Sequence, residues 1–400
     1  MSLRRSLFFL FSIFAWSSAW ATPSVVLYGV IDTGFSYVHV SRNAVGGQTG
    51  LSASQFGMNS GVQSGSRWGM KGTEDLGDGW SVSFVLESGF NSDNGQLAQG
   101  GRGFGRQATL GGSHTDFGNL VVGRQSTIST NYLSAVDPFG ESFGQANIGA
   151  SFGSVNTVRY DNLIQYESPN LNGFQFGVGY STNTGVSGLY RSGQVDVFAP
   201  RSEYFGTVSN MRALTAAARY TYDEFSIVAS FDRAFAAGLV PGPDGPVSNM
   251  NDAQPTAWIV GGTYNFKVIE FALAYGRTYD GAFTGNGPGN GLSDTGLDTF
   301  TGGAGVLFDK GFDSQSTMVG FTVPVSGNGN ELMFSWQTKQ PRGRLSGDET
   351  FATQSILGVA YTHGLSKRTN LYFWGSYGNN FQMFNSAKSS VVGAGVRHLF

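Results

Sequence analysis

Segments of about ten residues, in which apolar and polar side chains alternate, recur along the chain to its last residue. Alternation with a period of two is the pattern of a β-strand whose two faces meet different surroundings. Beyond residue 21 no run of 18 or more apolar residues occurs, which excludes helical membrane spans. The sixteen segments are 25–38, 62–73, 80–90, 104–111, 117–125, 158–167, 174–182, 211–222, 225–235, 256–266, 268–279, 315–325, 331–340, 351–363, 369–377 and 390–400.

The connections between these segments alternate between short and long. The short ones contain the Gly, Asn and Asp that tight hairpin turns require, and the long ones are polar. Short turns on one side and long loops on the other are typical of bacterial membrane barrels. We therefore predict one all-β domain at residues 22–400, a 16-stranded antiparallel transmembrane β-barrel. The short connections include 74–79, 168–173, 223–224, 326–330 and 364–368, and the long ones 183–210, 236–255 and 280–314.

Segment 299–308 also has the strand pattern, which would make seventeen strands. Bacterial single-chain barrels have an even number of strands, with both termini on the periplasmic side. We therefore expect 299–308 to lie inside the long sixth outer loop, as a hairpin above the membrane. An eighteen-stranded barrel is the alternative.

The alternation also predicts which side chains line the interior. In the segment 158–167, Ile164 and Tyr166 lie on one face, and Arg159, Asp161 and Gln165 lie on the other. A charge facing the hydrocarbon midplane costs about 2–4 kcal/mol, so the charged face must look into the lumen. A polar lumen in a barrel of this strand number holds water.

The first residues have the pattern of a secretory leader. Arg4 and Arg5 precede an apolar stretch at 7–16, and Ala19 and Ala21 have the small-x-small spacing of a cleavage site. The stretch is shorter than the roughly 20 residues that span a bilayer. We expect a signal peptide at 1–21, although an uncleaved anchor or a buried helix would also fit an apolar stretch.

Charge and residue usage exclude several function classes. Without the leader, 22 Lys and Arg stand against 27 Asp and Glu, a balance that argues against nucleic acid as a partner. The chain has no cysteine, so it has neither disulfides nor thiolate metal sites. We expect no metal and no cofactor, because the four histidines have no ligand spacing. They are His39, His114, His363 and His398.

Short motifs spread in order over the mature chain resemble the Gram-negative general porins, particularly the β-proteobacterial type. The motifs are LYGVID at 27–32, SRWGMKGTEDLG at 66–77, RQA at 106–108, GRQ at 123–125, RYDN at 159–162, YESP at 166–169, LSKRT at 365–369 and RHLF at 397–400.

This resemblance implies an outer-membrane homotrimer that passes ions and small hydrophilic solutes. It implies insertion by the barrel-assembly machinery, which reads the C-terminal strand ending at Phe400. It also implies that the third outer loop, 126–157, folds into the lumen and narrows it. Residues 137–144, DPFGESFG, resemble the acidic Pro/Phe/Gly stretch of that loop, in a different order from the commoner Pro-Glu-Phe-Gly form.

Opposing rows of charge across such a constriction would orient dipolar solutes and set ion preference. The predicted positive row is Arg67, Arg106, Arg124 and Arg159, the predicted loop acids are Asp137 and Glu141, and Glu87 is a wall acid that could pair with the arginines. The excess of basic groups favours a weak anion preference. Alternatively, the arginines serve only to hold the loop through salt bridges.

Three other functions are alternatives to a general diffusion pore. A barrel protease or lipase would need a Ser–His or Asp–His constellation, which four scattered histidines do not supply. A plugged structural or adhesive barrel would need a narrower barrel or a plug domain. The nearest competitor is a porin selective for a sugar or for an anion such as phosphate.

Overall fold

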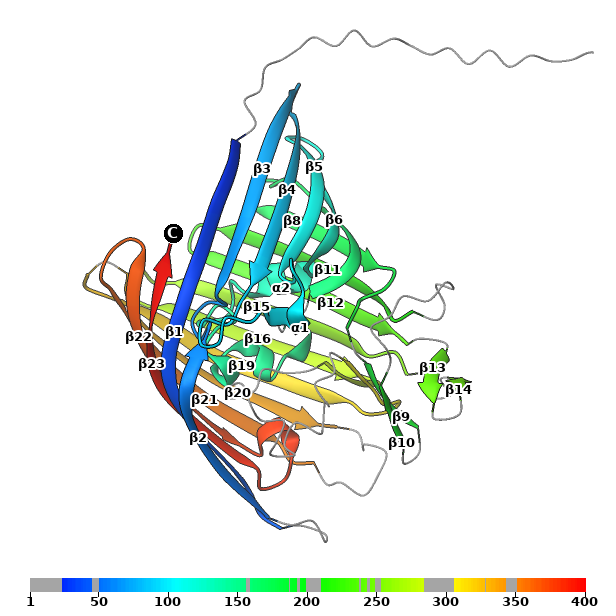
Figure 1. The fold of residues 1–400 in the computed structure, drawn as a ribbon, viewed down its shortest axis with the longest axis vertical. Coiled ribbons are helices and arrows are strands. Elements are labelled where there is room, and N and C mark those ends of the chain that lie inside the picture. The colour runs from blue at the N-terminus through cyan, green and yellow to red at the C-terminus, as the bar shows by residue number, and fades with distance from the viewer. Residues whose placement is uncertain are drawn as a thin grey trace, which may run out of the picture.

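The computed structural model describes residues 24–44, 50–155, 159–186, 188–192, 195–198, 210–236, 239–242, 245–248, 253–283, 306–327, 329–342 and 351–400. One large antiparallel sheet dominates these residues, and Figure 1 shows that it curls around an interior space. Its strands are β1 (Ser24–Arg42), β2 (Leu51–Ser60), β3 (Arg67–Gly77), β4 (Trp80–Gly89), β5 (Gln107–His114), β6 (Gly118–Ser126), β7 (Arg159–Glu167), β8 (Phe174–Ser181), β11 (Arg212–Tyr222), β12 (Phe225–Phe235), β15 (Thr256–Asn265), β16 (Glu270–Tyr279), β19 (Ser314–Val325), β20 (Asn330–Pro341), β21 (Gln354–Gly364), β22 (Thr369–Asn379) and β23 (Lys388–Leu399).

The sheet closes because the first strand pairs with the last. β1 is antiparallel to β23 with Val30 opposite Leu399, and the backbones of Gly29 and Phe400 exchange two hydrogen bonds of 3.1 Å. Every other neighbouring pair is also antiparallel, and except for β1 with β3 the two partners are consecutive among the wall strands. Closure leaves no free sheet edge, so the backbone groups of the wall are satisfied within the sheet.

Seventeen strands fill sixteen positions in the wall. Residues 33–42 of β1 pair with β2, and residues 24–30 pair with β3. β2 and β3 therefore form one interrupted strand. Between them, the segment 61–66 leaves the wall. The predicted 16-stranded antiparallel barrel is confirmed, with a second strand that begins earlier than the segment 62–73 and is broken.

The two faces of the wall differ as the alternation predicts. Apolar side chains on the outside are about half exposed, among them Leu120 at 51%, Ile164 at 51% and Phe373 at 54%. Such residues suit contact with hydrocarbon. Among the described residues, no helix has both the length and the apolar character needed to cross a bilayer.

The described part of the loop between β6 and β7, residues 127–155, lies inside the barrel, as expected for the segment 126–157. It contains α2 (Ile128–Leu133) and the 3-10 turns η1 (Gly144–Ala146), η2 (Ile148–Ala150) and η3 (Gly153–Val155). One apolar cluster joins Ile128, Tyr132 and Ile148 of this loop to the inner faces of β11, β12, β15, β16 and β19. A second joins Phe139, Phe143 and Ala146 to the inner faces of β20 to β23.

This inner loop therefore covers one side of the wall, from β11 round to β23, and leaves open the space in front of β3 to β7. Two further short elements are α1 (Ala98–Gly101), after β4, and η6 (Phe381–Met383), before β23.

The other long connections carry small sheets of their own. β9 (Gly188–Ser192), β10 (Val195–Phe198), β17 (Gly281–Phe283) and β18 (Val306–Phe308) form one, and β13 (Leu239–Gly242) pairs with β14 (Gly245–Ser248). In Figure 1, β9, β10, β13 and β14 lie at the end of the barrel away from the C-terminus. β18 pairs with β17 and β9 and not with the wall, which confirms the loop placement of 306–308; residues 299–305 lie outside the described part.

Candidate functional site

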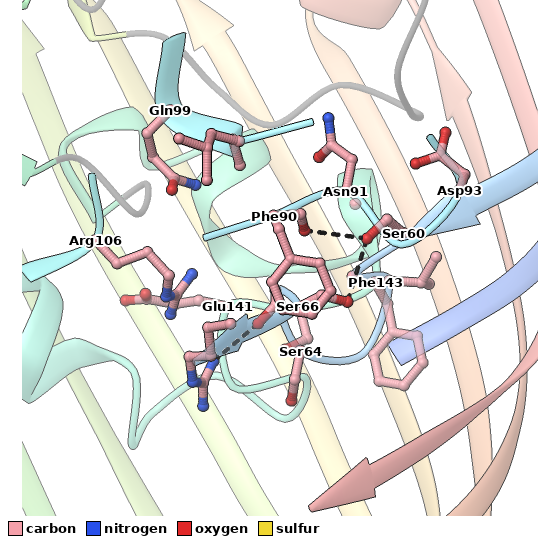
Figure 2. Close-up of a pocket in the computed structure, with 18 of the residues that line it drawn as sticks. Ser60, Ser64, Ser66, Phe90, Asn91, Asp93, Gln99, Arg106, Glu141 and Phe143 are labelled. Carbon is pink, nitrogen blue, oxygen red and sulfur yellow. Dashed lines mark hydrogen bonds between the residues drawn. The ribbon is translucent and has the colours of Figure 1, made fainter. Parts of the chain in front are cut away.

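A polar cavity of 880 Å³ lies inside the barrel, between the tip of the inner loop and the open part of the wall. Loop residues 140–144, the inward segment 61–66 and the connection after β4 form three of its sides. Arg67, Arg106 and Arg159 reach it from the wall. Figure 2 shows Arg106 and Glu141 extending into this space from the wall and the loop.

Glu87 on β4 forms an ion-paired cluster with Arg67 and Arg106. Its carboxylate lies 2.6 Å from Nε of Arg106 and 3.5 Å from Nε of Arg67. The Tyr28 hydroxyl donates a third contact, at 2.9 Å. Arg67 stands opposite Gly89 and Glu87 opposite Gln107, so the sheet register itself brings the three charges together. The predicted pairing of Glu87 with the arginine row is what the structure contains.

A second cluster forms around Asp161 on β7. Arg102, just after α1, places Nη1 2.8 Å from both Asp161 oxygens, and Nη1 of Arg124 lies 2.6 Å from Oδ1. The sequence pattern put Asp161 in the lumen but did not identify it as a site residue, and it gave no signal for Arg102. Arg102 lies in a connection, where alternation carries no information.

A β-bulge brings Arg124 to this cluster. In a regular strand Arg124 would share the outward face of Leu120 and Val122, which are 51% and 41% exposed. The register between β6 and β7 shifts between Gly123 and Gln125, and Gly123 has φ +126°. A side chain on residue 123 would meet the Ala108 carbonyl oxygen at 2.1 Å, so this bulge requires glycine.

Glu141 is the acid that the loop presents to the arginines. It lies at the cavity, and its backbone has φ +60°, a conformation that the surrounding turn imposes. Burial, reinforced by the neighbouring Asp137, raises the pKa of Glu141 to about 9, against the opposing effect of Arg159. Its carboxyl is therefore largely neutral at pH 7.

Asp137 lies elsewhere, and its place in the constriction row was a wrong expectation. Its side chain is buried and its oxygens accept hydrogen bonds from the loop amides of Phe139 at 3.2 Å and Glu141 at 2.8 Å. Burial raises its pKa to about 6. The carboxyl comes before the Pro-Phe-Gly turn rather than within it, so it shapes the turn from behind and does not reach the cavity.

The inward segment 61–66 meets the loop tip from the other side. The Phe143 amide donates to the Val62 carbonyl at 2.7 Å. The segment is held to the wall by Asp32, which accepts from the Ser64 amide and from the Tyr372 hydroxyl, each at 2.6 Å. The interior is thus narrowed by two segments that touch each other.

The open wall carries a surplus of positive charge. Among the described residues, five arginines, three from the cavity and two from the Asp161 cluster, face the acids Glu87 and Asp161 on the wall and Asp93 at the cavity, a surplus of two. Ionised Glu141 would reduce the surplus to one. Among the described residues, no group of three His, Cys, Asp or Glu could hold a metal ion.

A closed barrel with an apolar outside, a polar inside and a charged, partly obstructed interior defines a class of protein: a membrane channel with a charged constriction.

Comparison with known proteins places the chain more closely. The family model described as Gram-negative porin matches residues 10–380. An outer membrane porin protein of Bordetella pertussis is 44% identical over 389 residues, 96% of each chain. Outer membrane porin protein 32 of Delftia acidovorans is 35% identical over 185 residues, 45% of this chain and 50% of its own length. The chain belongs to the Gram-negative porin family.

Among solved structures, the anion-selective porin from Comamonas acidovorans matches with a TM-score of 0.65 at 22% identity, covering 94% of this chain and all of that one. At this identity the likeness concerns the fold. With the family membership, it makes the protein an outer-membrane channel for passive diffusion of small solutes.

Proposed function

We propose that this porin is a general diffusion channel with a preference for anions, set by Arg67, Arg106, Arg124 and Arg159 on the wall together with Arg102. The surplus of positive charge on the open wall carries the proposal. Fixed charges in a narrow, low-dielectric passage raise the local concentration of counter-ions. The matched Comamonas structure, described as anion-selective, gives independent support.

The arginines can both line the passage and be held in ion pairs. Glu87 and Asp161 each face two arginines, so each cluster keeps one net positive charge while its guanidinium groups are fixed in position. The alternative in which the arginines only anchor the loop is less favoured, because the carboxylates within ion-pair distance of Arg67, Arg102, Arg106 and Arg124 are those of the wall residues Glu87 and Asp161.

A sugar-selective porin is the second candidate, because a chitoporin of Vibrio furnissii is 26% identical over 59% of this chain. Sugar binding along a passage favours aromatic faces. The aromatic residues at the described cavity are Phe90 and Phe143 only, and Phe143 is buried against Tyr372 and Trp374. The polar, cationic lining therefore favours the first candidate.

The assembly proposed with this function is a homotrimer in the outer membrane, reached after removal of residues 1–21 and insertion through the C-terminal strand ending at Phe400. We propose no catalytic activity and no cofactor. Chemical crosslinking of the detergent-extracted, unheated protein tests the trimer: a product three times the monomer mass supports it, and monomer alone at every crosslinker dose refutes it.

The ion preference is tested by the reversal potential of the native channel in a planar bilayer under a KCl gradient. We expect the native reversal potential to have the sign that indicates chloride preference. In Arg106→Gln we expect this potential to shift towards the value for cation preference. Lys388→Gln, which removes a charge from the exposed outer end of β23, is the matched control and leaves the potential unchanged. A cation-selective native channel, or equal shifts in the two variants, would refute the proposed role of the arginines.

A further inference from the structure

A second cavity, of 450 Å³, lies on the inside of the wall near the short turns. It is bounded by the turn between β19 and β20, the turn between β21 and β22 and the last residues of β23. β1 begins and β23 ends at this end of the barrel, which is the periplasmic end in this family. Gln63 lines this cavity, whereas residues 60–62 and 64–67 line the first one, so the inward segment separates the two.

Three cationic side chains surround this second cavity, namely Lys367, Arg368 and Arg397, and one acid, Glu331. No ion pair within 4 Å joins any of the three to a carboxylate in the described part of the chain. Nε of Arg397 is buried and has no hydrogen-bond partner. An unpaired buried donor of this kind is costly unless something accepts from it.

Asp32 is the carboxylate that the structure places within electrostatic range of Arg397. Both of its oxygens are already occupied, one by the Tyr372 hydroxyl and one by the Ser64 amide. Asp32 therefore attracts Arg397 towards the wall but leaves its donors available. Arg397 lines the cavity, so its guanidinium group can meet an anion held there.

Arg397 also continues the cationic wall of the first cavity. It is close enough to Arg67 for the two guanidinium groups to repel each other. Arg67 faces the first cavity and Arg397 the second, on either side of the inward segment. An anion that leaves the first cavity towards the periplasm thus meets Arg397 next, and then the two cations of the turn.

We propose that this second cavity is a binding site for small oxyanions, of phosphate or carboxylate chemistry, at the periplasmic mouth. Guanidinium and ammonium groups are the usual partners of such anions, and a guanidinium can bind two oxygens at once. The site extends the proposed anion preference, on which it rests: the constriction selects anions, and the mouth holds them.

The test is the block of chloride current by inorganic phosphate, measured in planar bilayers at constant KCl and pH. Native protein gives a saturable block. Arg397→Gln raises the half-blocking phosphate concentration about fivefold, the worth of one charge pair at 4 Å in water, and adding Lys367→Gln raises it further. Lys388→Gln, on the same strand as Arg397 at its outer end, is the matched control and leaves the block unchanged. Heat-modifiable mobility on gels establishes that each variant is folded.

The outcomes separate this site from the selectivity of the constriction. Chloride preference with no saturable phosphate block, or with a block that Arg397→Gln leaves unchanged, overturns the mouth site alone. An equal weakening in Lys388→Gln also overturns it, because the effect would then be general surface charge. A cation-preferring native channel overturns the constriction proposal whatever the phosphate result. Repeating the titration with acetate distinguishes a carboxylate-binding site from one that needs the phosphate geometry.

Discussion

Besides the two apolar clusters, buried amide side chains hold the inner loop against the wall, and Gln337 on β20 makes the most hydrogen bonds to the loop among them. Its Nε2 donates to three successive loop carbonyls, those of Gln145 at 3.3 Å, Ala146 at 3.1 Å and Asn147 at 2.8 Å. The Gln337 side chain is fully buried. Gln337→Leu keeps the bulk and removes this donor.

The cost can be worked from what each carbonyl retains. The Ala146 carbonyl still accepts from the Ser335 hydroxyl at 2.8 Å, and the Asn147 carbonyl still accepts from the Ala150 amide at 3.2 Å. The Gln145 carbonyl loses its donor altogether. One buried carbonyl left unsatisfied and two weakened ones cost about 3 kcal/mol, and removal of the Gln337 Oε1, a buried acceptor without a partner, offsets about 1 kcal/mol. The net loss of about 2 kcal/mol of loop attachment is roughly a thirtyfold change in the attached-to-detached ratio.

Single-channel recording measures this ratio as the fraction of time spent away from the main conductance level. We expect that fraction to rise about thirtyfold in Gln337→Leu. Thr338→Val is the control, because it also removes one hydrogen bond from β20, the one between Thr338 and Thr317, but on the other face. A fraction that is unchanged, or that rises equally in Thr338→Val, would refute the view that Gln337 anchors the loop.

Three further predictions concern charge and processing. Glu87→Gln leaves Arg67 and Arg106 without their carboxylate partner, so chloride preference increases. The unfolding temperature on heated gels falls, because each lost ion pair is partly buried. A rise in thermal stability would contradict this prediction. Because the pKa of Glu141 is raised to about 9, its carboxyl ionises as the pH rises from 8 to 10. The added negative charge lowers chloride preference over that window, and the same drop in Glu141→Gln would show that another group is responsible. Mass spectrometry of the mature protein gives an N-terminus at Thr22, and any product that retains the apolar leader would disprove cleavage after Ala21.

The strands were predictable because successive side chains of a strand face lipid and water in turn, so apolar and polar residues alternate along the sequence. The exception is β2 (Leu51–Ser60), which the sequence pattern missed. Only Phe56 and Met58 mark its outer face, and its other side chains are mostly small or polar, such as Ser52, Ala53 and Ser54. The break after β2 was equally invisible, since Gly61 and Ser66 are compatible with either a turn or a strand.

The candidate site was predictable only for residues on strands, where odd and even positions face opposite sides of the wall, a rule called strand parity below. Parity placed Arg67, Glu87, Arg106 and Arg159 inside, but the pairing of Asp161 with Arg102 depends on a connection that parity does not describe. The prediction for Asp137 was wrong because an acid in a loop can point either to the cavity or back into its own turn, and the sequence does not distinguish the two.

The central claim is an open, water-filled passage, and the most direct test is swelling of liposomes that contain the purified native protein. We expect swelling in a series of uncharged sugars, with rates that fall smoothly as solute size increases and rise linearly with concentration. No swelling from correctly folded protein, or a rate that saturates for one sugar, would contradict a general diffusion channel.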